Sequence, residues 1–118
     1  YMIAYDGSAT ADDAIAKFAE SALLKDLPAH IVMVASETKE HLNQLKSAKD
    51  LLLNSGREAR ATLLDGSVQD ALSLYREQNN IDLMVMGAYG HSRFREFFVG
   101  SQTSKMIARS PIPLLLLR

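Results

Sequence analysis

Two short segments of the chain combine glycines with side chains that could bind an anion. The first is Asp6-Gly7-Ser8, and the second is residues 87–101, which holds three of the chain's six glycines. Glycines let backbone N–H groups approach a phosphate without a Cβ in the way. The alternative is that these glycines only end a strand and cap a long loop. The glycine pattern by itself leaves both interpretations open.

The second segment leads into a predicted helix from Ser101 to Arg109. The first N–H groups of a helix and the positive end of its dipole favour a phosphate, and Ser101 and Thr103 could add hydroxyl donors. Asp6 would face this segment, where it could accept a hydrogen bond from a ribose hydroxyl or hold a divalent ion. No catalytic base is indicated, because His91 in the loop has no second titratable group at a fixed spacing.

The elements that would position these segments alternate between strands and helices. Apolar runs predict strands at residues 2–5, 31–35, 59–64, 81–86 and 113–117, and helical spacing of apolar residues predicts helices at residues 11–23, 38–54, 67–78 and 101–109. Strict alternation indicates an α/β fold with a parallel sheet and helices on both faces. The expected architecture is a Rossmann-like, doubly wound sheet of five strands in the order 3-2-1-4-5. A ligand would bind beyond the carboxyl ends of strands 1 and 4, where both candidate segments fall.

Each predicted helix has an apolar face that should pack on the sheet. In the first helix this stripe runs from Ala11 to Leu23. In the second it comprises Leu42, Leu45, Ala48 and Leu52. His30 and His41 are expected to be exposed.

The composition is that of one globular domain covering residues 1–118. The net charge is −1, so a dedicated nucleic-acid binder is not expected, and no apolar run is long enough to span a membrane. The absence of cysteine excludes disulfides and thiolate zinc sites and fits a reducing compartment. Because Tyr1 already reads as part of a strand, the chain either lacks a few leading residues or is a domain cut from a longer chain.

The spacing of the second segment, Gly87-x2-Gly90-x9-Gly100-Ser101, resembles the nucleotide-binding signature G-x2-G-x9-G-[ST] of the universal stress protein family. The flanking residues are similar as well. Ile3-Ala4-Tyr5-Asp6-Gly7-Ser8 looks like the family's first strand and turn, residues 81–87 like its fourth strand, and Ser110-Pro111-Ile112-Pro113-Leu114 like the start of its last strand. The resemblance covers essentially the whole chain.

This resemblance implies a cytoplasmic domain that binds ATP, ADP or AMP and acts in the stress response through dimer or partner contacts. Asp6 would lie near the ribose or a nucleotide-bound Mg²⁺ or Mn²⁺, Val34 would offer backbone atoms to the adenine, and Met86 would line the base pocket. Hydrolysis of ATP would be slow or absent. The implied nucleotide-binding residues are Ala4, Tyr5, Asp6, Val34, Met86, Gly87, Gly90, Gly100, Ser101, Gln102 and Thr103.

Two other function classes compete with this one. The first is a universal stress protein module that binds no nucleotide, because Tyr89, Phe94 and Gln102 fill its own loop. The second is an enzyme such as an ATP pyrophosphatase, which would want a Ser-Gly-Gly-rich loop after the first strand. The residues Asp6-Gly7-Ser8-Ala9-Thr10 do not provide one.

The last predicted strand, Pro113–Leu117, is a candidate contact surface. It is apolar and falls at the edge of the expected sheet, where a strand invites pairing with another chain. The family resemblance also implies a dimer at this strand. The partner would be either a second copy of the chain or a sister domain in tandem.

Overall fold

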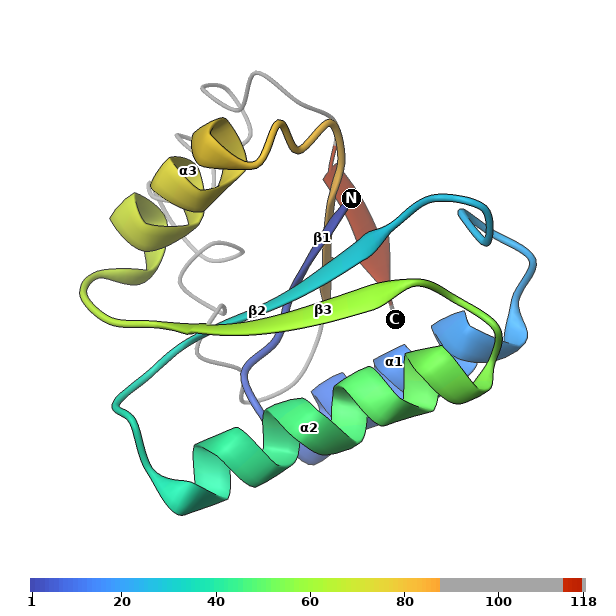
Figure 1. Cartoon of the computed structure of the whole chain (residues 1–118), viewed down its shortest axis with the longest axis horizontal. Helices are drawn as coiled ribbons and strands as arrows, with labels where there is room; N and C mark the ends of the chain where they lie inside the picture. Colours follow the sequence, from blue (N-terminus) through green and yellow to red (C-terminus); the bar gives the residue numbers. More distant parts are fainter. Residues whose placement is uncertain (88–113, 118) are drawn as a thin grey trace.

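The computed structural model of the chain describes residues 1–87 and 114–117 (Figure 1). All pairs of neighbouring strands are parallel, and the order across the sheet is β3-β2-β1-β4-β5. The predicted α/β fold and strand order are therefore confirmed. The elements in chain order are β1 (Met2–Ala4), α1 (Ala9–Glu20), β2 (Ala29–Val34), α2 (Lys39–Asn54), β3 (Ala59–Leu64), α3 (Val68–Gln78), β4 (Met84–Gly87) and β5 (Leu114–Leu117).

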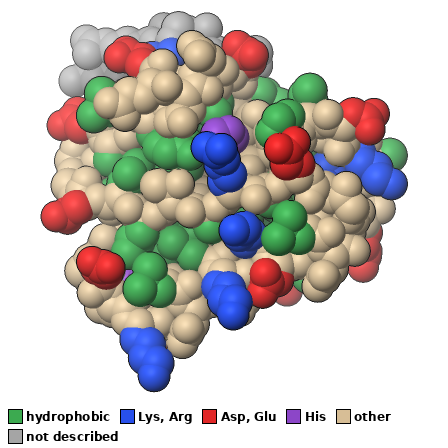
Figure 2. Space-filling model, viewed as in Figure 1, with side chains coloured by type: hydrophobic (Ala, Val, Ile, Leu, Met, Phe, Trp, Pro, Cys, Tyr) green, Lys and Arg blue, Asp and Glu red, His purple; other side chains and the backbone are tan. Residues whose placement is uncertain are grey.

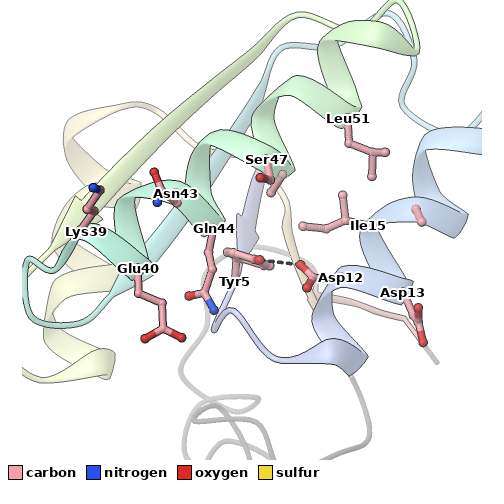
Figure 3. A pocket seen from close by; sticks show the side chains of 12 residues that line it. Tyr5, Asp12, Asp13, Ile15, Lys39, Glu40, Asn43, Gln44, Ser47 and Leu51 are labelled. Carbon is pink, nitrogen blue, oxygen red and sulfur yellow. Dashed lines mark hydrogen bonds between the residues drawn. The ribbon is translucent and has the colours of Figure 1, made fainter.

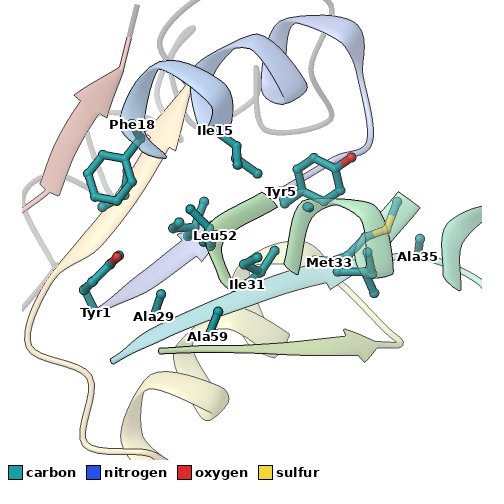
Figure 4. Close-up of a cluster of buried hydrophobic side chains, with 14 residues drawn as sticks. Tyr1, Tyr5, Ile15, Phe18, Ala29, Ile31, Met33, Ala35, Leu52 and Ala59 are labelled. Atoms are coloured by element: carbon teal, nitrogen blue, oxygen red, sulfur yellow. The ribbon is translucent and has the colours of Figure 1, made fainter. Parts of the chain in front are cut away.

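Helices cover both faces of the sheet. Figure 1 shows α1 and α2 side by side on one face and α3 on the other. Successive side chains of a strand point to opposite faces, so Ile3 and Tyr5 pack under α1 and α2 (Figure 4), whereas Met2 and Ala4 pack under α3. Burial on both faces explains why β1 and residues 31–34 of β2 are continuous apolar runs.

Helix α1 ends three residues earlier than its apolar pattern predicts. The N–H and hydroxyl groups of Ser21 both donate to the carbonyl oxygen of Phe18, at 3.1 and 2.8 Å, and close the helix there. Leu23 is consequently 49% exposed, while Leu24, at a φ of 55°, turns towards the core. The prediction of Leu23 as an inward residue is wrong because the helix stops before reaching it.

Two further predictions about the elements need correction. Leu42 is 45% exposed. The buried face of α2 consists of Leu45, Ala48 and Leu52, and Leu42 in the first turn lies beside this face rather than on it. Strand β4 begins at Met84 rather than at residue 81. Its register pairs Met84 with Met2, the first residue of β1, so β1 has no strand residue opposite residues 81–83.

The sheet ends at β3, in agreement with the predicted strand order. Figure 2 looks onto this side of the molecule and shows hydrophobic side chains on both sides of β3, with charged side chains around them. Arg60 is exposed on the strand, whereas Leu63 and Leu64 are half-buried. His30 on the neighbouring β2 is also half-buried rather than exposed, because its Nδ1 is hydrogen-bonded to the Tyr75 hydroxyl at 2.8 Å.

None of the helices within residues 1–87 combines the length and hydropathy needed to cross a bilayer.

Candidate functional site

The carboxyl ends of three adjacent strands bring together four of the predicted site residues. Ala4 of β1 pairs with Met86 of β4, and Gly87 is the next residue of β4. On the other side of β1, Ala4 pairs with Val32, so Val34 lies two residues further along β2. Ala4, Val34 and Met86 belong to the same buried cluster on the α3 face. These three side chains therefore lie in one buried apolar cluster near the point where the strand order reverses.

The turn from β1 into α1 orients Asp6. Its Oδ1 accepts hydrogen bonds from the backbone N–H of Ser8 at 3.0 Å and from the Ser8 hydroxyl at 2.7 Å. The same Ser8 Oγ accepts from the N–H of Ala11 at 3.1 Å and so caps α1. Asp6 is half-buried just beyond the end of β1. The Asp-Gly-Ser sequence thus ends a strand, starts a helix and orients one acidic side chain.

A contact from α2 completes this turn. Gln44 Nε2 donates to the carbonyl oxygen of Gly7 at 3.3 Å. Gly7 has a φ of +78°, a conformation that favours glycine, and a Cβ added here would lie only 2.5 Å from Gln44 Oε1. Glycine is needed at this position both for its backbone conformation and for the close approach of α2.

Tyr5 lies on the opposite face of the sheet from Ala4, Val34 and Met86. Its ring is buried under α1, and its hydroxyl donates to Asp12 Oδ1 at 2.5 Å. Burial, and then the hydrogen bond to Asp12, raises the pKa of the Tyr5 phenol, which therefore stays protonated and serves as a donor. The predicted site residues of β1 are thus divided between the two faces of the sheet.

A groove of about 870 Å³ lies between α1 and α2, next to the turn (Figure 3). Asp12 and Asp13 contribute from α1, while Asn43, Gln44 and Ser47 contribute from α2. Three carboxylates and one lysine make the lining acidic. The lining residues are Tyr5, Asp12, Asp13, Ile15, Ala16, Lys39, Glu40, Asn43, Gln44, Ser47, Ala48 and Leu51.

In the described part of the chain, no three His, Cys, Asp or Glu side chains gather to hold a metal ion. Asp6 alone would supply one carboxylate, so the predicted ion at Asp6 would need oxygen ligands from a bound nucleotide. The predicted residues Gly90, Gly100, Ser101, Gln102 and Thr103 lie outside the described residues. So do the loop and the helix that contain them.

Sequence reasoning missed the contribution of α2 to this site. Gln44 precedes the buried Leu45 and is itself only partly exposed. A polar residue at the border of a helix's apolar stripe was the available signal. It could not identify Gly7 as the partner, because that contact joins residues 37 positions apart.

The chain matches the universal stress protein family over residues 2–118 and belongs to that family. It is 39% identical over 119 residues to universal stress protein Slr1230 of Synechocystis sp., a match that covers 99% of this chain and 42% of that protein. The chain spans about half or less of the length of the curated relatives it matches.

Two solved structures share the fold. One is a universal stress protein in complex with cAMP, which superimposes with a TM-score of 0.72 at 21% identity and covers 98% of this chain and 94% of that chain. The other is the universal stress protein from Archaeoglobus fulgidus in complex with dAMP, with a TM-score of 0.71 at 19% identity and coverage of 99% and 95%. At these identities the likeness establishes the fold.

Proposed function

We propose that this domain binds an adenine nucleotide at the carboxyl edge of β1, β2 and β4 and acts in the stress response by changing its contacts with a partner. The observation that carries the proposal is the Asp6 carboxylate, oriented just beyond the carboxyl end of β1, next to the strand ends that carry Ala4, Val34 and Met86. In open, doubly wound parallel sheets in general, ligands bind beyond the carboxyl ends of the strands at such a switch point, which supports this location. Family relatives described in complex with cAMP and dAMP give further support.

In this proposal each part of the nucleotide has its own protein partners. Asp6 accepts from a ribose hydroxyl or ligates a nucleotide-bound Mg²⁺ or Mn²⁺. Val34 offers its backbone to the adenine, and Ala4 and Met86 line the base pocket. The phosphates lie against a segment that starts at Gly87 and continues through Gly90, Gly100, Ser101, Gln102 and Thr103.

Binding, rather than catalysis, is the proposed activity. Asp6 is oriented by Ser8 on the rigid end of a strand, so it is arranged before a ligand arrives and little ordering entropy is lost on binding. Because Ser8 also caps α1, a ligand that contacts Asp6 acts directly on the start of that helix. Hydrolysis of ATP at this site would be slow or absent.

Calorimetric titration with ATP, ADP and AMP, with and without Mg²⁺, tests the proposal. We expect the folded wild-type protein to bind at least one of them. Asp6→Asn should weaken binding about tenfold, because it removes a charged acceptor worth more than a neutral one. Asp13→Asn makes the same charge change on α1 and should leave the affinity within twofold.

Absence of binding heat with folded wild-type protein would contradict the proposed function. It would favour the module whose loop is filled by its own Tyr89, Phe94 and Gln102, three residues outside the described part of the chain.

We also propose that residues 1–118 form one domain that pairs through its last strand, Pro113–Leu117. Among the described residues β5 has a single strand neighbour, β4, so its other edge is the expected contact. The partner is either a second copy or a sister domain in a longer chain. A cytoplasmic location agrees with the absence of cysteine and with an adenine nucleotide as ligand.

A further inference from the structure

The peptide group between Gly7 and Ser8 is held from both sides. Its carbonyl oxygen accepts from Gln44 Nε2 at 3.3 Å, and its N–H donates to Asp6 Oδ1 at 3.0 Å. In a trans peptide the C=O and N–H bonds point in opposite directions, and no cis peptide is found in the described part of the chain. The two hydrogen bonds therefore hold one rigid plane between α2 and Asp6, and rotation of that plane would break both.

The Gly7–Ser8 plane rotates about the ψ angle of Gly7 and the φ angle of Ser8. Gly7 has no Cβ to restrict its ψ, whereas Ser8 has a φ of −72°, which is ordinary for a non-glycine residue. The lack of a Cβ is also what lets Gln44 approach, because a Cβ would lie 2.5 Å from its Oε1. Gln44 therefore adds a contact from α2 to a turn that the Asp6–Ser8 hydrogen bonds already hold from within.

We propose that Gln44 is a positioning residue of the nucleotide site. It fixes the Gly7–Ser8 peptide plane and, through the Ser8 N–H, the orientation of the Asp6 carboxylate. Figure 3 shows Gln44 extending from α2 towards the segment that leads into α1. Its amide acts through Gly7 and needs no contact with the ligand. This inference rests on the proposed function, because it concerns the affinity of the same site.

The effect on affinity follows from preorganisation. When the plane is fixed, Asp6 is already oriented and binding does not have to order the turn. Without Gln44, the Ser8 hydroxyl still donates to Asp6, so orientation is weakened rather than abolished. The loss of one neutral hydrogen bond corresponds to a few-fold to tenfold change in an equilibrium constant.

Two substitutions test Gln44, and a neighbouring residue provides the control. Gln44→Met keeps the length of the side chain and its helix propensity but removes the donor. Gln44→Glu replaces the donor with an oxygen that repels the Gly7 carbonyl. Asn43→Asp makes the same charge change at an exposed amide that lines the same groove. The readouts are the dissociation constant for ADP and, in the protein without nucleotide, hydrogen exchange of the Ser8 amide.

We expect Gln44→Met to weaken ADP binding about threefold and Gln44→Glu about tenfold, with Asn43→Asp within twofold of wild type. The Ser8 amide should exchange faster in both Gln44 variants and not in the control. If Gln44 served only the stability of the fold, its substitution would instead lower the melting temperature. The ADP affinity and the exchange of the Ser8 amide would then match those of Asn43→Asp. That result would overturn the inference.

The two proposals fail in different ways. If wild-type protein binds no adenine nucleotide, the proposed function fails and the affinity role of Gln44 fails with it. Ser8 exchange is measured without nucleotide, so it still decides whether Gln44 holds the peptide plane. If wild-type protein binds ADP but the Gln44 variants behave like the control, only the inference about Gln44 is overturned.

Discussion

Arg57 is a buried cation that caps the C-terminal end of α1, although it follows α2 in the sequence. It is 3% exposed and donates to the carbonyl oxygens of Phe18, Ser21 and Leu23 at 2.8–3.0 Å. Its guanidinium carbon also lies 4.6 Å from the centre of the Phe18 ring. These carbonyls mark the end of α1, where the negative end of the helix dipole favours a positive charge. Arg57 thus acts as a C-terminal cap supplied from beyond α2.

Replacing Arg57 with Met should destabilise the protein by about 2–4 kcal/mol. The substitution keeps much of the apolar volume but removes the Arg57 donor from the carbonyl oxygens of Ser21 and Leu23 and one of the three donors to the carbonyl oxygen of Phe18. Arg60→Met is the matched control, because Arg60 is exposed on β3 and should cost less than about 0.5 kcal/mol. Urea unfolding monitored by circular dichroism measures both. Equal stability of the two variants would contradict the capping role of Arg57.

His30 should make the stability of the fold depend on pH. Burial, and then the positive charges of the N-terminal ammonium and Arg60, lower the pKa of His30 below its usual value of about 6.5. The unfolded chain then binds more protons than the fold between the two pKa values. The stability that neutral His30 contributes is fully present above about pH 6.5 and declines as the pH falls towards the lowered pKa.

A His30→Gln variant isolates this contribution from the carboxylates that titrate in the same range. We expect wild-type protein to lose more stability than the variant when the pH falls from 7.5 to 5. Denaturant unfolding at several pH values gives the difference. Parallel pH profiles for the two proteins would rule out His30 as the source.

At the scale of elements, each of the three described helices begins with a hydroxyl side chain placed just after a strand. The caps of α1, α2 and α3 are Ser8, Thr38 and Ser67. Each side-chain oxygen accepts a hydrogen bond from the backbone N–H of the residue three positions later. Two of these caps are serines with the same local geometry. Only Ser8 has an additional function in the proposal, since it also orients Asp6.

Ser8→Ala and Ser67→Ala should therefore have similar effects on stability and different effects on binding. Each loses one N-cap hydrogen bond, and we expect about 1 kcal/mol of destabilisation in both. Only Ser8→Ala should weaken nucleotide binding, by about threefold to tenfold, because it removes the hydroxyl that donates to Asp6. Unfolding and calorimetry on the same samples make the comparison. Equal loss of affinity in the two variants would point to a general effect of helix stability.

At the scale of the whole molecule, the sheet has two ends with different surroundings. Strand β3 forms one end and carries the exposed Arg60, a charged residue of the kind that discourages pairing of edge strands. The apolar β5 forms the other end among the described residues. The difference favours β5 as the contact between copies.

We expect the native mass of the 118-residue chain to be twice its 13.0 kDa at micromolar concentrations. Size-exclusion chromatography with light scattering, followed over a dilution series, measures it. Addition of the nucleotide that binds most tightly would show whether the ligand shifts the association. A single-chain mass at all concentrations would contradict pairing between copies and favour a sister domain as the partner.

Much of the fold was predictable because its signals are local in sequence. In α3, the apolar residues at helical spacing, Val68, Ala71, Leu72 and Tyr75, all pack against the core beneath the helix. The helix spacing failed at Leu23 and Leu42, where the apolar side chain is exposed. In both cases the apolar spacing is compatible with a buried helical position, but tertiary contacts decide the outcome. Ser21 and Arg57 end α1 before Leu23, and the rotation of α2 on the sheet turns Leu42 outward.

The sequence by itself determined the order of the elements and the positions of Asp6 and Gly87 at the ends of their strands. Apolar periodicity and turn residues are properties of neighbouring positions, and they are sufficient for this. Only the tertiary structure decided which distant side chains complete the site and close the helices. Gln44 reaches Gly7 across 37 positions, and Arg57 reaches the end of α1 across 34 to 39. Such contacts depend on how α1 and α2 are rotated and packed on the sheet, which no local pattern encodes.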